Sequence, residues 1–205
     1  EPAPRALRIH PRKLSTTAAL EMLDDAGVVA EPSPAVDSCV RVGGGSLAGC
    51  DAVRQGLMTP RSEASQLVTE LLPPGDGWTV DACAGRGGKS VQLAEAGAPG
   101  VLAIDIDVAQ LADAEAAASR AATPEVRAVC ADLTSAFPVR RRFDRILVDA
   151  PCSGLGTVRR HPEIKWRIDA SRLGGLARRQ RQLLSSAVAT LEPGGVVLYV
   201  TCSTE

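Results

Sequence analysis

Residues 143–167 read FDRILVDAPCSGLGTVRRHPEIKWR, and this segment is the strongest indication of an α/β fold in the chain. Phe143 and the apolar run 146–148 predict a buried parallel strand, which turn residues then end. Asp149 and Cys152 therefore follow directly after the carboxyl end of a strand. In open parallel sheets ligands bind at that edge, so the segment predicts a functional site.

A cysteine after a strand can also be a structural residue, because free cysteines are often buried and inert. The Gly-rich turn and the basic segment after Cys152 favour a functional role instead. That basic segment contains Arg159, Arg160, Lys165, Trp166 and Arg167.

Charge is distributed unevenly along the chain. The formal net charge is −1, but residues 139–181 contain twelve Arg or Lys against four Asp or Glu. A basic stretch beside a candidate site is typical of proteins that act on a polyanion. Solvated helix faces would explain Arg178–Arg181, but they explain less well the basic residues around Cys152.

The bulk composition excludes several classes. With 205 residues, the chain can form one ordinary domain with a small additional unit. It contains no apolar run near the roughly 18 residues of a membrane span and no secretory signal pattern, so we expect a cytoplasmic protein without a membrane anchor. The six cysteines are scattered without Cys-x-x-Cys spacing, which predicts reduced thiols rather than a disulfide framework, and no metal site.

The first part of the chain, residues 1–52, predicts a small α+β unit. We expect a strand at Leu7–Ile9, a helix from Ser15 or Thr16 to about Ala26, and a strand at Cys39–Val42. The same pattern fits either a discrete module or an extension of the main domain.

The main domain is predicted at residues 53–205 and begins with a helix capped by Ser62 and stopped by Pro73. Its expected inner face consists of Ala64, Leu67, Val68, Leu71 and Leu72.

A glycine loop follows the first predicted strand of the main domain, Trp78–Ala84. Glycines at 85, 87 and 88 allow close approach of the backbone to a ligand, and the helix after them offers unpaired N–H groups. A phosphate-binding P-loop is excluded because Cys83 stands where it needs glycine. The dinucleotide motif is excluded because Ser90 replaces its third glycine.

Three acids come at the ends of successive strands. Asp81 precedes the glycine loop, Asp105 ends a strand at 101–104, and Asp132 follows a strand at 126–130. Asp105 has the spacing of an acid that accepts ribose hydroxyls, and Asp132 is placed to reach an adenine amino group. Any one of them could be a helix cap, but together they predict a site for an adenine nucleoside without pyrophosphate. S-adenosylmethionine is the leading candidate.

The last elements complete an alternating pattern. A helix from about Ser171 to Leu191 is followed by the turn Glu192-Pro-Gly-Gly and a strand at Val196–Val200. A doubly wound sheet of order 3-2-1-4-5 would bring Cys152 and Cys202 to the same edge. The residues expected on the inner face of the helix are Leu173, Leu176, Leu183, Leu184, Ala187 and Leu191.

Two thiols beside a methyl donor suggest a particular reaction. Carbon 5 of a pyrimidine is a poor nucleophile until a thiolate adds at carbon 6. The reaction needs a reactive cysteine, a group that holds the pyrimidine edge, and a positive charge that favours thiolate. Cys152 or Cys202, Asp149 and Lys89 supply this set, and spacing alone leaves open which cysteine attacks.

The motifs DACAGRGGKS, LAIDID, CADL, FDRILVDAPCSGLGTVRRHPEIKWR and VVLYVTCST resemble those of the Sun family of RNA (cytosine-5)-methyltransferases, from about Leu7 to the last residue. The resemblance implies a class I S-adenosylmethionine-dependent methyltransferase fold whose last strands are missing from this chain. It implies a 16S ribosomal RNA substrate and no obligate protein partner.

The resemblance also implies individual roles. Cys202 would be the nucleophile, Cys152 would help to release methylated RNA, and Lys89 and Asp149 would face the target cytosine. The basic residues Arg159, Arg160, Lys165 and Arg167 are expected to bind RNA phosphates. The cofactor positions of the family correspond to Cys83, Ala84, Gly85, Arg86, Gly87, Gly88, Lys89, Asp105, Asp132 and Asp149.

Three positions depart from the family pattern. Gly85-Arg86 replaces Ala-Pro, His10 replaces an Asn, and Arg61-Ser62 replaces Gln-Asp. Alternative functions are a transfer RNA or DNA cytosine-5 methyltransferase, or a module that binds the cofactor or RNA without catalysis. In DNA enzymes the Pro-Cys motif carries the nucleophile, so first attack by Cys152 would indicate that class.

Overall fold

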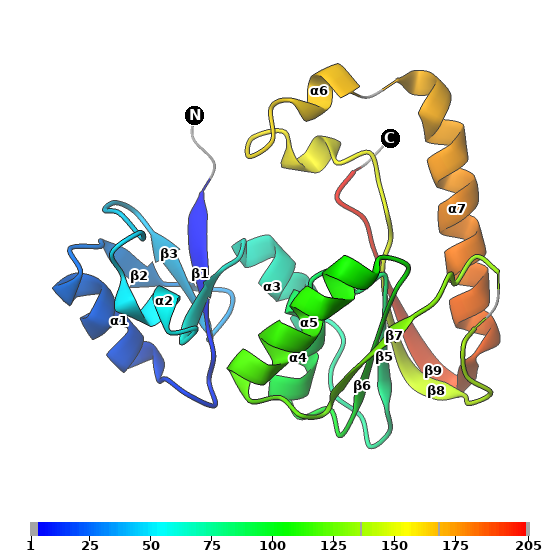
Figure 1. Cartoon of the computed structure of the whole chain (residues 1–205), viewed down its shortest axis with the longest axis horizontal. Coiled ribbons are helices and arrows are strands. Elements are labelled where there is room, and N and C mark those ends of the chain that lie inside the picture. Colours follow the sequence, from blue (N-terminus) through cyan, green and yellow to red (C-terminus); the bar gives the residue numbers. More distant parts are fainter. Residues whose placement is uncertain (1–3, 136, 168, 204–205) are drawn as a thin grey trace.

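The computed structural model describes residues 4–135, 137–167 and 169–203, without the side chains of Arg167 and Ala170. Two units lie side by side, each built on its own sheet (Figure 1). Among the described residues no helix is long and apolar enough to cross a membrane.

The small unit is a four-stranded antiparallel sheet covered by helix α1 (Thr16–Asp25), with the short helix α2 (Asp51–Arg54) beside it. Ser15 caps α1 by accepting a hydrogen bond from the Ala18 amide, as predicted. The short strands at Ala30–Pro32 and Met58–Pro60 were not predicted, because three residues carry too little periodicity. In spatial order the strands are β2 (Ala30–Pro32), β3 (Cys39–Val42), β1 (Arg5–Ile9) and β4 (Met58–Pro60).

The main unit is a five-stranded parallel sheet of order β7-β6-β5-β8-β9. This confirms the predicted order 3-2-1-4-5, because the strands in chain order are numbered from β5. Its strands are β5 (Thr79–Ala82), β6 (Val101–Asp105), β7 (Val126–Cys130), β8 (Phe143–Asp149) and β9 (Leu191–Val200).

Helices cover both faces of this sheet. Val101, Ala103 and Leu147 pack against helices α4 (Gly88–Glu95) and α5 (Val108–Ala121) on one face. Residues of opposite strand parity, including Ile104 and Ile146, pack against Leu183 and Ala187 of α7 (Ala170–Ala189) on the other face. Burial of both faces produces the continuous apolar strands that predicted a parallel sheet.

Two local predictions were wrong. Leu191, expected at the end of the preceding helix, and the turn expected at 192–195 both lie inside β9, because α7 ends at Ala189. The register of β9 against β8 shifts between Phe143 and Arg145. The inner face of α3 (Glu63–Glu70) contains Gln66 and Thr69, whereas Leu67 and Leu71 are exposed. Of the predicted inner residues, Leu72, just after the helix, is buried in the core. Gln66 is buried because its side chain donates to the Arg61 carbonyl oxygen, a tertiary contact that periodicity cannot reveal.

A buried ion-pair cluster joins the two units. Glu95, at the end of α4, accepts hydrogen bonds from Arg8 at 2.5 Å and from His10 at 2.8 Å. His10 also bonds Thr59 of β4. Burial raises the pKa of Glu95, but the His10 and Arg8 side chains outweigh it and hold that pKa below its usual value.

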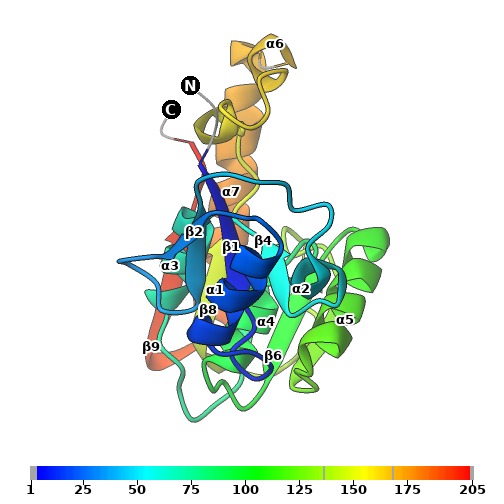
Figure 2. The same cartoon turned by 90° about the vertical axis from the view of Figure 1, so that its left-hand side faces the viewer.

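Beyond β8 the chain forms a 3-10 turn (Leu155–Thr157) and the short helix α6 (Ile164–Arg167) before α7 begins. Figures 1 and 2 show that α6 stands clear of both sheets. The segment between Cys152 and α7 therefore extends above the carboxyl ends of the strands.

Candidate active site

The glycine loop between β5 and α4 has a backbone that few residues other than glycine adopt. Gly85 and Gly87 have φ of 54° and 73°, and Cys83 shares the left-handed region at 63°. A Cβ on Gly87 would lie 2.6 Å from the Ala114 Cβ, so the loop also needs glycine for its packing against α5. α4 begins without a side-chain cap, which leaves its first amides open toward the loop.

The three predicted acids have different surroundings. Asp81 is fully buried and accepts a hydrogen bond from Ser90 at 2.6 Å, and burial raises its pKa to about 6. Asp105 accepts the Gly85 amide at 2.8 Å, and it thereby shapes the glycine loop. Hydrogen bonds from Thr134 lower the pKa of Asp132.

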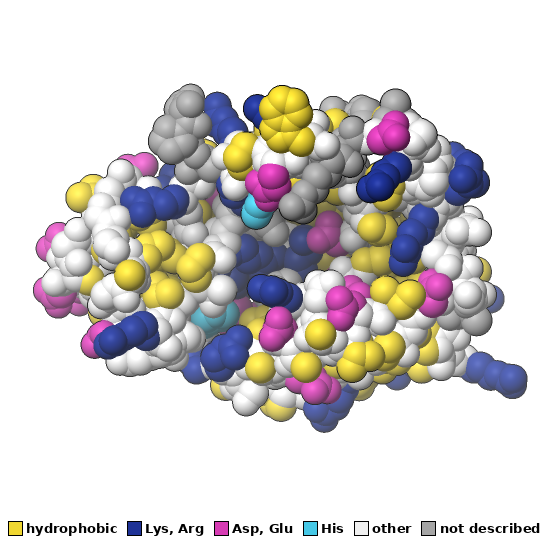
Figure 3. Space-filling view, turned by 45° about the horizontal axis from the view of Figure 1, so that its top comes forward, with side chains coloured by type: hydrophobic (Ala, Val, Ile, Leu, Met, Phe, Trp, Pro, Cys, Tyr) yellow, Lys and Arg dark blue, Asp and Glu magenta, His cyan; other side chains and the backbone are white. Residues whose placement is uncertain are grey.

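A cavity of about 890 Å³ lies at the carboxyl ends of β5, β6 and β8. All predicted cofactor positions except Gly87 line it. Those lining residues are Cys83, Ala84, Gly85, Arg86, Gly88, Lys89, Asp105, Asp132 and Asp149. Figure 3 shows a hollow in the surface with Lys and Arg side chains inside it.

The sequence prediction missed several residues that line this cavity. Ile106 is 52% exposed directly after Asp105, and Leu133 follows Asp132. Their position next to the acids was the available signal. An apolar side chain beside each carboxylate provides one surface for a purine ring and one acceptor for its polar edge, so the cavity fits an adenosine group.

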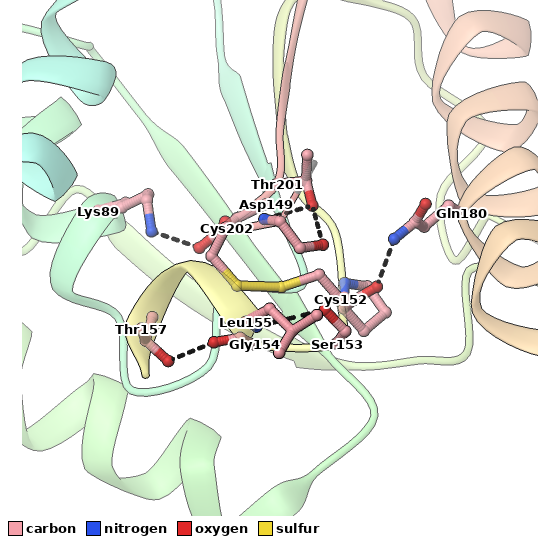
Figure 4. The surroundings of a disulfide bond; sticks show 12 residues. Lys89, Asp149, Cys152, Ser153, Gly154, Leu155, Thr157, Gln180, Thr201 and Cys202 are labelled. Atoms are coloured by element: carbon pink, nitrogen blue, oxygen red, sulfur yellow. Dashed lines mark hydrogen bonds and ion pairs between the residues drawn. A yellow bond between two sulfur atoms is a disulfide. The ribbon is translucent and has the colours of Figure 1, made fainter. Parts of the chain in front are cut away.

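Cys152 and Cys202 form a disulfide in the structure, with their Cα atoms 6.4 Å apart (Figure 4). Their expected meeting at one edge of the sheet is confirmed. The prediction of reduced thiols throughout is wrong for this pair, because β8 and β9 are neighbours and their ends bring the two sulfurs together. Cys39, Cys50, Cys83 and Cys130 are free.

An ion pair between Lys89 and Asp149 lies next to the disulfide (Figure 4). Lys89 comes from the first turn of α4 and Asp149 from the end of β8. Both side chains are partly buried and line the main cavity. The four residues predicted to do the chemistry are therefore gathered at one place.

Hydrogen bonds hold the turn after Cys152 in place. Gln180 of α7 donates to the Pro151 carbonyl oxygen at 2.9 Å, and Thr157 donates to the Gly154 carbonyl oxygen at 2.7 Å (Figure 4). Gly156 packs so closely on Cys202 that a Cβ there would overlap the Cys202 carbonyl oxygen. The turn therefore covers one side of the cysteine pair.

The residues predicted to bind RNA divide into two groups. Arg159 and Arg160 line a second cavity of about 600 Å³, together with Arg5 and Arg41 of the small unit. Lys165 is exposed on α6, and the side chain of Arg167 lies outside the described residues.

Arg61 contacts the glycine loop, which the sequence did not predict. Its guanidinium donates to the Gly88 carbonyl oxygen at 2.6 Å and to Thr69 at 3.2 Å. Burial lowers its pKa to about 10. Arg61 and His10, two departures from the pattern of the Sun family, both line the main cavity where the two units meet.

This strand order, with a glycine loop and acids at the strand ends, defines a class I S-adenosylmethionine-dependent methyltransferase fold. A family model described as 16S rRNA methyltransferase RsmB/F matches residues 68–205. The chain belongs to that family.

The relatives agree with this assignment. Ribosomal RNA small subunit methyltransferase B of Erwinia tasmaniensis is 36% identical over 207 residues, which is 98% of this chain and 48% of that protein. The Pseudomonas putida protein of the same name is 36% identical over 206 residues, or 98% of this chain and 47% of that protein. The chain thus spans about half the length of these relatives.

Solved structures share the fold. The crystal structure of PH0851 matches 99% of this chain and 47% of its own, with a TM-score of 0.91 and 28% identity. NSun6 from Pyrococcus horikoshii, solved with SFG, matches 100% of this chain and 77% of its own, with a TM-score of 0.90 and 19% identity.

Proposed function

We propose that the protein transfers a methyl group from S-adenosylmethionine to carbon 5 of a cytosine in RNA, with 16S ribosomal RNA as the expected substrate. The observation that carries the proposal is the meeting of Cys152, Cys202, Lys89 and Asp149 beside the main cavity. Membership of the RsmB/F family supports the same reaction.

The cofactor would be held by the glycine loop and the strand-end acids. Asp105 offers carboxylate lone pairs to the ribose, and Asp132 with Leu133 offers an acceptor and an apolar surface to the adenine. When bound, S-adenosylmethionine supplies an electrophilic methyl group. The loop backbone lets the donor approach closely because its glycines have no Cβ.

The proposed order of steps follows from the polarity of the cytosine ring, in which carbon 6 is electrophilic. The Cys202 thiolate adds to carbon 6 of the cytosine, and the electron pair this releases makes carbon 5 nucleophilic. Carbon 5 takes the methyl group, a base then removes its proton, and the Cys202–carbon 6 bond breaks to restore the aromatic ring. Cys152 assists this release of the RNA. Asp149 holds the polar edge of the base.

Lys89 has two functions in this scheme. Its ammonium group pairs with Asp149 and thereby fixes the carboxylate that faces the base. The positive charge close to the cysteines also favours the thiolate over the thiol. Cys83 is unsuited to attack, because burial raises the pKa of its thiol to about 12.

The target cytosine must leave any helix to reach this site, because carbon 6 is inaccessible in a stacked base pair. The proposal is tested by mapping 5-methylcytosine at single-nucleotide resolution in ribosomal and transfer RNA from cells with and without the gene. Loss of one 16S site, restored by the wild-type gene but not by Cys202→Ala, is the expected result. Loss of a transfer RNA site would reassign the substrate, and unchanged RNA would contradict the proposal once redundant enzymes are deleted.

A further inference from the structure

Aromatic residues are scarce in this chain, and one of them is conspicuously exposed. The sequence has two Trp, one Tyr and two Phe. Phe137 and Phe143 pack on each other at 5.7 Å between ring centroids, and Trp78 packs against the core. The side chain of Trp166 is 82% exposed. A single exposed apolar side chain is ordinary on a protein surface, so the inference depends on what surrounds this ring.

Trp166 is held near the cysteine pair by its helix. Ile164 of α6 lies against Gly154, and its Cδ1 atom is 3.0 Å from the point that a Cβ on Gly154 would occupy. Gly154 is two residues from Cys152. Residues two apart on a helix point in nearly opposite directions, so Trp166 points away from the turn while its backbone stays beside it.

The surroundings of Trp166 are basic. The Lys165 ammonium group lies 5.2 Å from the centre of the indole ring, a cation–π arrangement. Arg159 and Arg160 belong to the same segment and line the 600 Å³ cavity, here called the arginine groove. Its other wall carries Arg5, Arg41, Glu31 and Glu63, and Arg41 is paired with Glu63. Four Arg against two Glu leave the lining with a net positive charge. Gly156 also lines the groove and packs on Cys202, so the groove ends at the reactive residues.

An exposed indole and a groove of net positive charge, to which the same segment contributes Arg159 and Arg160, match the two parts of a nucleotide. Aromatic rings stack on the faces of unpaired bases, and arginines neutralise phosphates. A protein partner would need an acidic surface, and nothing about a groove that leads to Cys202 favours one. Unpaired RNA offers a base face to the indole ring and phosphates to the arginines.

We propose that Trp166 is a stacking platform for an unpaired base of the RNA strand next to the target cytosine, with the phosphates between them in the arginine groove. The inference rests on the proposed RNA methylation and adds a binding residue and a path for the strand.

Fluorescence provides a direct test because the chain has two tryptophans. In a Trp78→Phe protein, the tryptophan emission comes from Trp166 alone. Single-stranded oligocytidylate of eight nucleotides should quench this emission in a saturable way, whereas inorganic polyphosphate of matched charge should not, because it has no base to stack. Equal effects of the two polyanions, or bound RNA without quenching, would overturn the proposal.

Affinity provides the second test. Trp166→Ala should weaken binding of the same oligocytidylate by roughly 5- to 150-fold, the range of base-stacking contributions, while Trp166→Phe retains most of the affinity. The salt dependence should stay the same in both variants, whereas Arg160→Ala should reduce it. Val188→Ala, another exposed apolar residue, is the matched control and should bind normally. Wild-type affinity in Trp166→Ala would refute the stacking role.

The two proposals can fail separately. If Trp166→Ala methylates and binds RNA like the wild type, the stacking platform is wrong and RNA methylation stands. If the wild type shows the tryptophan-dependent RNA binding but the full-length protein never methylates a cytosine, the stacking platform stands and the reaction is wrong.

Discussion

Cys152 and Cys202 are fifty residues apart in the sequence, yet they are bonded to each other at the ends of neighbouring parallel strands. Asp149 pairs in register with Val200, so each cysteine follows its strand end by two or three residues. In the proposed reaction both sulfurs must be free. The bonded pair is therefore an oxidised form that lacks the nucleophile.

We predict that the oxidised protein is inactive and that a thiol reductant restores methyl transfer, because only a thiolate can add to carbon 6. Titration of thiols in the denatured protein should give four groups in the oxidised form and six after reduction. Equal methylation rates with four and with six free thiols would contradict this prediction.

The two cysteines should differ when each is replaced in reduced protein. Cys202→Ala should abolish methyl transfer and form no covalent complex. Cys152→Ala should allow attack but slow release, so a protein–RNA adduct that survives denaturing electrophoresis should accumulate. The reverse pattern would exchange the two roles. Cys130→Ala, a free and exposed cysteine, is the control and should leave both readouts unchanged.

The ion-pair cluster between the units should contribute strongly to stability. Glu95→Gln leaves Arg8 buried without its carboxylate, which should cost about 3–5 kcal/mol in the free energy of unfolding. Asp51→Asn removes an exposed ion pair to Arg54 and should cost less than about 1 kcal/mol. Urea unfolding of both variants measures the difference, and equal costs would show that burial of the pair is unimportant.

The pH dependence of stability should report on Asp81. Its folded pKa of about 6 lies above the usual carboxyl value of 3.8, so the folded state holds a proton that the unfolded state has lost. Stability should therefore fall as pH rises from about 4 to about 6 and then level off with respect to this group. Asp81→Asn should flatten that part of the profile in urea unfolding. An unchanged slope would contradict the assignment.

Gly87 in the glycine loop and Gly97 after α4 both have a positive φ, so a comparison of the two separates the cost of backbone strain from the cost of a steric clash. Gly87→Ala places a Cβ against Ala114 at a positive φ, and should reduce both stability and affinity for S-adenosylmethionine. Gly97→Ala has a φ of 103° but an open space around its Cβ, so it should cost about 1 kcal/mol and leave cofactor affinity unchanged. Calorimetric titration with the cofactor and thermal unfolding distinguish the two variants.

Much of this architecture could be predicted because it depends on local patterns. The apolar run before Asp149 and the glycines after Ala84 indicate their structure in a few adjacent residues. The arrangement 3-2-1-4-5 then follows from the alternation of strands and helices. The division at residue 52 stays a prediction, although β4, at Met58–Pro60, still pairs with the sheet of the small unit.

The remaining features depend on contacts between distant residues. Gln66 faces inward on α3 because its amide donates to the Arg61 carbonyl oxygen, and His10 is buried because Glu95 lies opposite it. Neither partner can be read from the periodicity of the element itself. The oxidation of Cys152 and Cys202 depends on the surrounding redox conditions as much as on their positions.

Helix α4 begins next to Lys89 and ends at Glu95, and its eight residues span about 12 Å. Arg8 and His10 of the small unit bind Glu95 at one end of this helix. Lys89, which lies beside the cysteine pair, stands at the other end. If RNA binding moves the small unit, α4 must move with it, or the buried ion pair between Arg8 and Glu95 must break. If Lys89 acts in the reaction as proposed, α4 links the position of the small unit directly to the position of that lysine.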